Sequence, residues 1–98
     1  MTQCGIFVEL KARAGKEEEV AAFLKSALPL VEAEPETVSW YAVRFDQTTF
    51  GIFDSFNNEA GRNAHLQGRV AEALFARAAE LFEVPPSVRQ PAVLASKP

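Results

Sequence analysis

The chain has 98 residues, 48% of them hydrophobic and eight of them phenylalanine, which is the size and composition of one globular domain. The net charge is −3 and the ten Lys and Arg residues are scattered, which argues against nucleic-acid binding and against a basic helix lying on a membrane. No apolar run approaches the ~18 residues that span a bilayer. The N-terminus lacks a signal-peptide pattern, and the single cysteine, Cys4, cannot form an internal disulfide. We therefore expect one cytoplasmic domain over residues 1–98, with residues 95–98 as a flexible tail.

A strand and a helix are predicted in the first third of the chain. Residues 6–12 alternate with a period of two, which is typical of a strand, and Ala14-Gly15 then breaks the pattern. Residues 16–30 carry one apolar stripe and three glutamates in the first turn, which predicts a helix. Pro29 should kink or end this helix, and residues 32–36 should form a loop.

The remainder predicts a hairpin, two helices and a last strand. Residues 38–46 and 48–56 are rich in β-branched and aromatic residues and lie close together, which favours an antiparallel hairpin. Asn57 or Asn58 can cap a helix over residues 59–68. A bend at Gly68 should separate it from a helix over residues 69–82, which Pro85-Pro86 stops. Residues 87–94 read as a strand whose Pro91 indicates a sheet edge or bulge.

The order β-α-β-β-α-β is the ferredoxin-like α+β pattern, a four-stranded antiparallel sheet with its helices on one face. Alternation in the third strand directs Phe50, Ile52 and Phe56 to one face and Phe53 to the other. Aromatic side chains therefore stand on both faces, and the uncovered face exceeds the apolar patch that soluble monomers usually expose. We expect a second copy of the chain to cover it, giving a homodimer.

Several segments resemble the antibiotic-biosynthesis-monooxygenase superfamily: residues 40–45 (WYAVRF), 49–56 (TFGIFDSF), 59–62 (EAGR) and 64–66 (AHL). The opening strand, the Ala14-Gly15-Lys16 turn and the Glu34-Pro35 loop fit as well, so the resemblance covers nearly the whole chain. It implies a dimeric α/β barrel with a pocket between sheet and helices. It also implies a cofactor-independent monooxygenase, in which a small quinol-like or polyphenolic anion gives an electron directly to O₂. The protein would supply a dry apolar cavity and a base.

Two departures from the family pattern bear on activity. Many quinol-oxygenase relatives have Thr-Pro-His after the His-Leu-Gln, whereas this chain has Gly68-Arg69-Val70 and lacks the second histidine. Haem-degrading relatives use an Asn, a Trp and a haem-ligand His where this chain has Val8, His65 and Phe75. The resemblance therefore argues against haem degradation.

His65, the only histidine, is the candidate catalytic base, because imidazole can take a phenol proton near neutral pH. The alternative is a structural histidine that holds a loop or a backbone carbonyl. Trp40 and Tyr41 are adjacent and face opposite sides of their strand, so either could donate a hydrogen bond to substrate or simply pack. Arg44 could stabilise a bound anion or be solvated.

Three phenylalanines complete the predicted substrate-binding set, or else belong to the ordinary core: Phe23, Phe53 and Phe75. Asp54 interrupts an apolar run, and we expect it to pair with Arg44 or Arg62. One His and one Cys do not make a metal site, so we expect no metal and no other cofactor. The ligand would be a small apolar or aromatic molecule. Two further hypotheses are a non-catalytic dimeric module that binds a small molecule or acts in stress, and a non-oxidative isomerase that uses His65.

Overall fold

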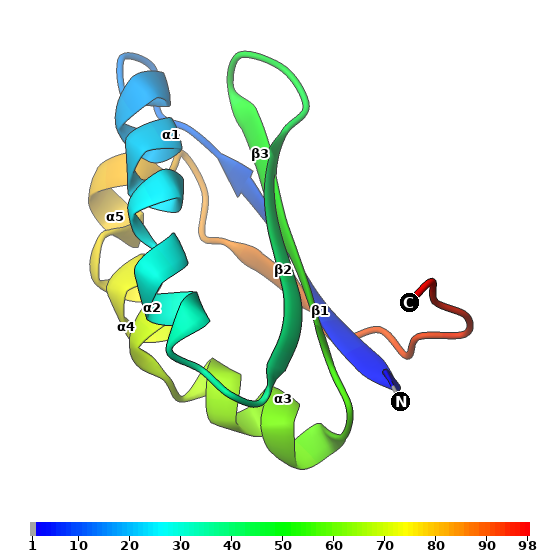
Figure 1. Ribbon diagram of the computed structural model, residues 1–98. Coiled ribbons are helices and arrows are strands. Elements are labelled where there is room, and N and C mark those ends of the chain that lie inside the picture. The colour runs from blue at the N-terminus through cyan, green and yellow to red at the C-terminus, as the bar shows by residue number, and fades with distance from the viewer. Residues whose placement is uncertain (1) are drawn as a thin grey trace.

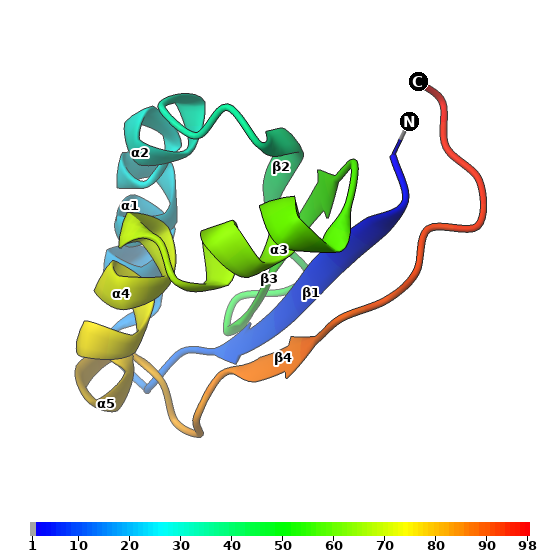
Figure 2. The ribbon, with the colours of Figure 1, turned by 90° about the horizontal axis from the view of Figure 1, so that it is seen from below.

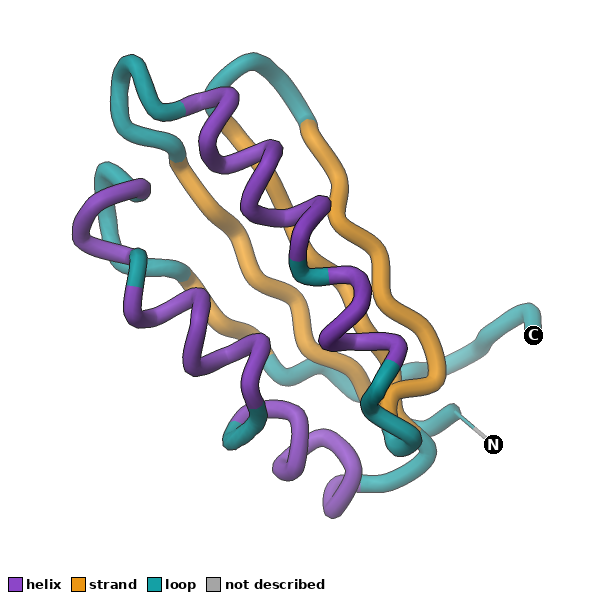
Figure 3. Tube along the Cα trace, turned by 60° about the vertical axis from the view of Figure 1, so that its left-hand side comes forward, coloured by secondary structure: helices purple, strands orange, loops and turns teal. Residues whose placement is uncertain are grey.

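The computed structural model describes residues 2–98 as two layers, with the helices on one face of an antiparallel sheet (Figures 1 and 3). The strands are β1 (Cys4–Lys11), β2 (Thr37–Arg44), β3 (Thr49–Phe56) and β4 (Ser87–Arg89), in the order β2-β3-β1-β4. The helices are α1 (Glu17–Ser26), α2 (Leu28–Glu32), α3 (Glu59–Leu66), α4 (Arg69–Ala76) and α5 (Ala78–Leu81). The ferredoxin-like prediction is therefore confirmed.

Both predicted long helices are broken. Pro29 does not end the first helix but lies in the first turn of α2, where its missing N–H costs no intrahelical hydrogen bond. The predicted helix over residues 69–82 divides at Arg77 into α4 and α5. Gly68 separates α3 from α4 as expected. Figure 2 shows that α3 runs from the end of β3 toward α4, so it links the sheet to the other helices. Within residues 2–98, no helix is both long and apolar enough to cross a bilayer.

The last strand is shorter than the predicted 87–94. β4 pairs with β1 only over Ser87–Arg89, because Pro91 has no N–H to continue the ladder. The chain still follows β1 beyond this point, since the Pro91 carbonyl accepts the Gly5 N–H at 3.0 Å. β4 lies at an edge of the sheet, as Pro91 predicted.

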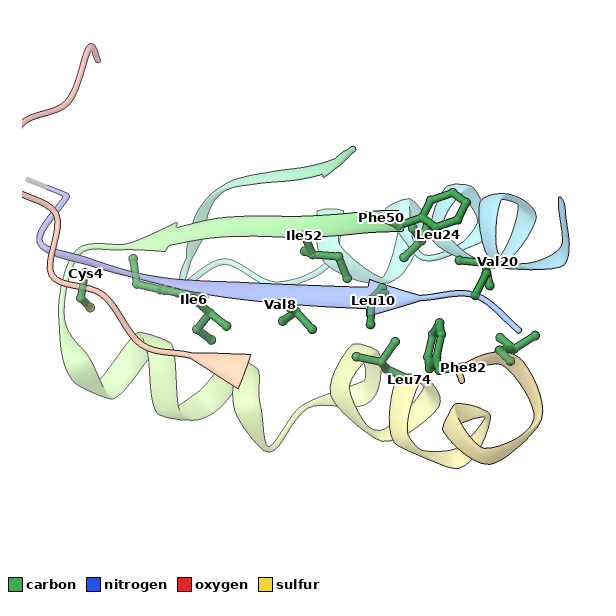
Figure 4. Close-up of a cluster of buried hydrophobic side chains, with 13 residues drawn as sticks. Cys4, Ile6, Val8, Leu10, Val20, Leu24, Phe50, Ile52, Leu74 and Phe82 are labelled. Carbon is green, nitrogen blue, oxygen red and sulfur yellow. The ribbon is translucent and has the colours of Figure 1, made fainter. Parts of the chain in front are cut away.

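The core lies between the sheet and the helices (Figure 4). On β1, Ile6, Val8 and Leu10 point toward the helices and are almost fully buried. Antiparallel pairing sets Val8 opposite Ile52 on β3, so both strands give alternate apolar side chains to this layer. The same alternation places Asp54, paired with Ile6, on the inward face, so this pattern carries a carboxylate into an apolar interior.

The opposite side of the sheet carries apolar side chains that no helix covers. Tyr41, Val43 and Phe45 are 60%, 42% and 61% exposed. Pairing of Tyr41 with Phe53, and of Phe53 with Phe7, extends this surface across three strands. We call these five residues the open face. The prediction that aromatic residues occupy both faces of the sheet is confirmed.

Candidate functional site

His65 is held between two carboxylates from distant parts of the chain. The Asn58 side chain caps α3 by accepting the Gly61 N–H at 2.8 Å, and this helix carries His65 inward. His65 Nε2 lies 3.0 Å from Asp54 Oδ2, and His65 Nδ1 lies 2.6 Å from Glu34 Oε1. Asp54 is 1% exposed and His65 is 7% exposed. We call this arrangement the Glu34–His65–Asp54 line.

The line favours a protonated imidazole. Burial by itself lowers the pKa of His65, but hydrogen bonds and charge from Asp54, and then from Glu34, outweigh it and raise that pKa above the usual 6.5. When both ring nitrogens carry protons, each donates to a carboxylate. The ring is therefore engaged on both sides by the chain itself. Among residues 2–98, no three His, Cys, Asp or Glu side chains are grouped as metal ligands.

The structure corrects the expected pairing of Asp54 with Arg44 or Arg62. Asp54 meets His65 instead, because the side chain points into the sheet–helix interior. Arg44 pairs with Glu18 at 2.9 Å, near the outer end of β2. Arg62 lies 3.4 Å from two backbone carbonyl oxygens, those of Gly5 and Pro91.

A small internal space, the inner cavity, lies beside Asp54 and His65. Its volume is about 30 Å³, and aliphatic side chains from β1, β3, α3 and α4 form most of its wall. Trp40 also lines it, and Phe75 and Val88, 52% and 37% exposed, lie on its wall as well. Two buried polar atoms of its lining residues, Trp40 Nε1 and Asp54 Oδ1, have no hydrogen-bond partner among residues 2–98.

Two larger hollows flank this cavity. The outer groove, between α1 and β2, has a volume of about 470 Å³ and includes Leu24, Trp40, Arg44 and Phe50 in its wall. Trp40 borders both this groove and the inner cavity. The loop pocket, of about 350 Å³, lies between α3 and residues 33–37 and is bordered by Glu34 and His65. The Glu34–His65–Asp54 line therefore joins the inner cavity to the loop pocket.

The predicted site residues fall into two groups. Trp40, His65 and Phe75 border the inner cavity, and Arg44 borders the outer groove. The others lie elsewhere: Tyr41 and Phe53 belong to the open face, on the far side of the sheet. Phe23 packs at the margin of the core, with the Arg77 guanidinium 5.7 Å from its ring centre.

Asp54 and Glu34 are the polar members of the site that the sequence did not assign. Asp54 carried a signal, because it is the only charged residue at an inward position of the third strand. Glu34 carried none, since it is one of several acidic residues in a loop and lies 31 positions from His65. The alternative role for His65, that of holding a loop, fits its contact with Glu34.

Comparison with known proteins places the fold. No protein-family model matches the sequence, and no curated protein gives a significant match. A crystal structure of the NE2512 protein of unknown function from Nitrosomonas europaea shares 49% identity over 99% of this chain and 94% of that one, with a TM-score of 0.97.

More distant structures carry a family name. A provisionally named antibiotic biosynthesis monooxygenase, also from Nitrosomonas europaea, superposes with a TM-score of 0.83 at 14% identity, covering 94% of this chain and 99% of that one. A protein of the same provisional name from Chloroflexus aurantiacus gives 0.75 at 13% identity, covering 98% and 97%. The chain therefore belongs to the same family as the NE2512 protein and has the fold of the antibiotic-biosynthesis-monooxygenase superfamily.

Proposed function

We propose that this protein is a cofactor-independent monooxygenase of a small quinol-like or polyphenolic compound. The observation that carries the proposal is Asp54, a carboxylate that is 1% exposed, linked to His65 and bordering a cavity in an otherwise apolar core. Buried titratable groups with specific partners are typical of functional sites. The names of the distant structural relatives support the same reaction class.

The substrate's aromatic body fits the outer groove. Its volume of about 470 Å³ is of the size that holds small ligands, and its wall is mainly apolar. Trp40 lies between this groove and Asp54, and no hydrogen bond fixes its indole nitrogen. The acidic hydroxyl group of the substrate would pass the indole edge and reach the carboxylate.

The reaction balances without an added reductant. Asp54, backed by His65, takes the proton of a phenol or enol, and the resulting anion gives one electron to O₂. This electron transfer leaves a substrate radical and superoxide. The two join at the carbon of the former ring-activated CH₂ group, and reprotonation gives a hydroperoxide. Loss of water leaves a carbonyl, so that R₂CH₂ and O₂ become R₂C=O and H₂O. The largely aliphatic wall of the inner cavity would limit the contact of the anion with bulk water.

Oxygen uptake with a panel of hydroquinones and hydroxylated CH₂ compounds tests the proposal, with ¹⁸O₂ tracing one oxygen atom into the product. Because a positioned base contributes about 10²- to 10⁴-fold, Asp54→Asn should slow turnover at least about 100-fold. His65→Gln should also slow it. Glu72→Gln, on the exposed side of α4, is the matched control and should leave the rate unchanged. Wild-type rates in Asp54→Asn would remove this carboxylate from the reaction.

Two other functions have an observation in their favour. The Glu34–His65–Asp54 line can accept and return a proton without oxygen, which suits a non-oxidative isomerase. Turnover under strictly anaerobic conditions, with solvent deuterium entering the product, would identify it. The outer groove, of about 470 Å³ and with a mainly apolar wall, would suit a module that binds a small molecule without turnover. A tightly held ligand that leaves chemically unchanged would identify that function.

We also propose that two copies of the chain pair through the open face. Tyr41 and Phe45 are each about three-fifths exposed there, next to the partly covered Phe53 and Phe7. Contiguous apolar surfaces of this kind are characteristic of interfaces between subunits. The pairing would leave the outer groove and the inner cavity on the other side of each sheet, as the dimeric α/β barrel requires.

A further inference from the structure

Two unpartnered polar atoms are carried by residues that sit opposite each other in the sheet. Trp40 of β2 pairs with Asp54 of β3, so both side chains leave the same face of neighbouring strands. Trp40 Nε1 and Asp54 Oδ1 are each buried without a hydrogen-bond partner in the described part of the chain, and both residues line the inner cavity. Buried polar atoms are nearly always paired, so one group in the inner cavity that contacts both atoms would account for this juxtaposition.

The chemistry of the two atoms restricts what that group can be. An indole N–H only donates a hydrogen bond, whereas an ionised carboxylate only accepts one. The group that satisfies both must therefore accept and donate. A carboxylate ligand would face Asp54 without a proton to offer, and an ammonium would leave Trp40 without an acceptor. A hydroxyl meets both needs with one oxygen atom.

The size of the space agrees with this chemistry. The inner cavity measures about 30 Å³, which exceeds the ~10–15 Å³ that a water-sized group requires. It therefore has room for a hydroxyl group, and it is far smaller than the ~300 Å³ of a pocket that holds a whole ligand. The remaining wall of the cavity is largely aliphatic, so a hydroxyl placed there finds few polar partners besides Trp40, Asp54 and His65.

We propose that Trp40 Nε1 and Asp54 Oδ1 form a subsite for a single phenolic or enolic hydroxyl, which displaces a resting water molecule. This assignment rests on the proposed function for the substrate class and specifies how the chain selects it. The indole N–H donates to the hydroxyl oxygen, and Asp54 accepts its proton. After proton transfer the same indole N–H stabilises the oxyanion, while His65 holds the other oxygen of Asp54.

Binding of phenol, anisole and toluene under nitrogen tests the subsite. Trp40 is the only tryptophan, so its fluorescence reports directly on the proposed position, and calorimetry measures the affinities. Because sites built to hydrogen-bond a hydroxyl strongly reject analogues that lack it, phenol should bind at least about tenfold more tightly than anisole or toluene. Affinities for phenol and anisole within about twofold of each other would overturn the proposal.

Variants separate the subsite from general apolar binding. Trp40→Phe keeps an aromatic ring but removes the donor, and it should reduce the preference for phenol over anisole to about threefold or less. Tyr41→Phe, which removes a hydroxyl on the open face, is the matched control and should retain the full preference. A preference that survives Trp40→Phe would overturn the assignment. Far-ultraviolet circular dichroism and unfolding curves verify that each variant is folded.

The outcome also separates this subsite from the oxygenase proposal. A clear preference for phenol without any oxygen uptake would support the proposed hydroxyl subsite and contradict the proposed monooxygenase function. Oxygen uptake without a preference for the hydroxyl would reject the subsite and keep the oxygenase. Binding under nitrogen measures the first property alone.

Discussion

His65 connects an interior carboxylate to a more exposed one, and this makes the stability of the fold dependent on pH. Its folded-state pKa is raised above the usual 6.5 because Asp54 and Glu34 stabilise the charged ring more than burial destabilises it. A group whose pKa is higher in the folded state than in the unfolded state stabilises the fold fully at pH values below its unfolded pKa. The contribution is then lost as pH rises through the folded-state value.

Substitution of His65 should therefore cost more at low pH than at high pH. We expect the difference in unfolding free energy between wild type and His65→Gln to be larger at about pH 6 than at about pH 9, as measured by urea denaturation. Glu72→Gln should show no such trend, because Glu72 is exposed and the carboxylates paired with the imidazole are those of Asp54 and Glu34. An equal cost at both pH values would contradict the raised pKa, and an NMR titration of the single imidazole would locate it.

The limits of sequence reasoning are clearest at these residues. The sequence showed His65 as the only histidine and Asp54 as a carboxylate isolated in an apolar strand, but not whether His65 faces the pocket. The contact between these two side chains was not visible in the sequence, because it depends on the position of α3 along β3. Glu34 joins them across 31 positions of chain, and loop geometry of that kind leaves no periodic signal.

The start of α3 decides where His65 is placed. The Asn58 side chain accepts the Gly61 N–H at 2.8 Å, one of the N–H groups that have no partner within the helix. Loss of a side-chain cap costs about 1 kcal/mol, so Asn58→Ala should lower the unfolding free energy by about 1 kcal/mol. Urea denaturation measures this change.

Asn57→Ala is the matched control, because the neighbouring exposed asparagine does not cap the helix. It should change the unfolding free energy by less than about 0.5 kcal/mol. Equal losses of unfolding free energy in Asn58→Ala and Asn57→Ala would mean that the Asn58 cap does not stabilise the fold. The sequence narrowed the cap to these two residues, and only the backbone geometry of Asn58, which is extended at φ −157°, selects it.

Prolines lie at two of the places where the predicted elements and the observed ones differ. Pro29 was expected to end or kink a helix, and the break falls at Ala27, which leaves the proline in the first turn of α2. Pro91 was expected at an edge, and it shortens β4 to Ser87–Arg89. The type and order of the elements followed from periodicity, whereas their ends depended on contacts with neighbouring segments.

At the scale of the molecule, the sheet divides two tasks between its faces. The helix-facing side holds the core, the inner cavity and the Glu34–His65–Asp54 line. The open face carries exposed aromatic side chains that a soluble monomer would leave in water. The sequence predicted this division because alternation in the strands places apolar residues on both sides, and the observed pairing of Tyr41 with Phe53 agrees with it.

A test of the open face follows from this division. If a second copy covers it, the wild-type protein should sediment as a dimer at micromolar concentration. Phe45→Glu should shift it to a monomer, since a carboxylate placed in the interface would lose its hydration without a partner charge. Analytical ultracentrifugation measures the mass of each species.

Val84→Glu provides the control, because Val84 is 56% exposed, close to the 61% of Phe45, but lies in the segment between α5 and β4. It should remain dimeric, since it adds the same charge outside the open face. A wild-type monomer at these concentrations would contradict the pairing. A Phe45→Glu protein that stays dimeric would move the interface elsewhere, and Tyr41 and Phe53 would then be free to take part in binding on that side of the sheet.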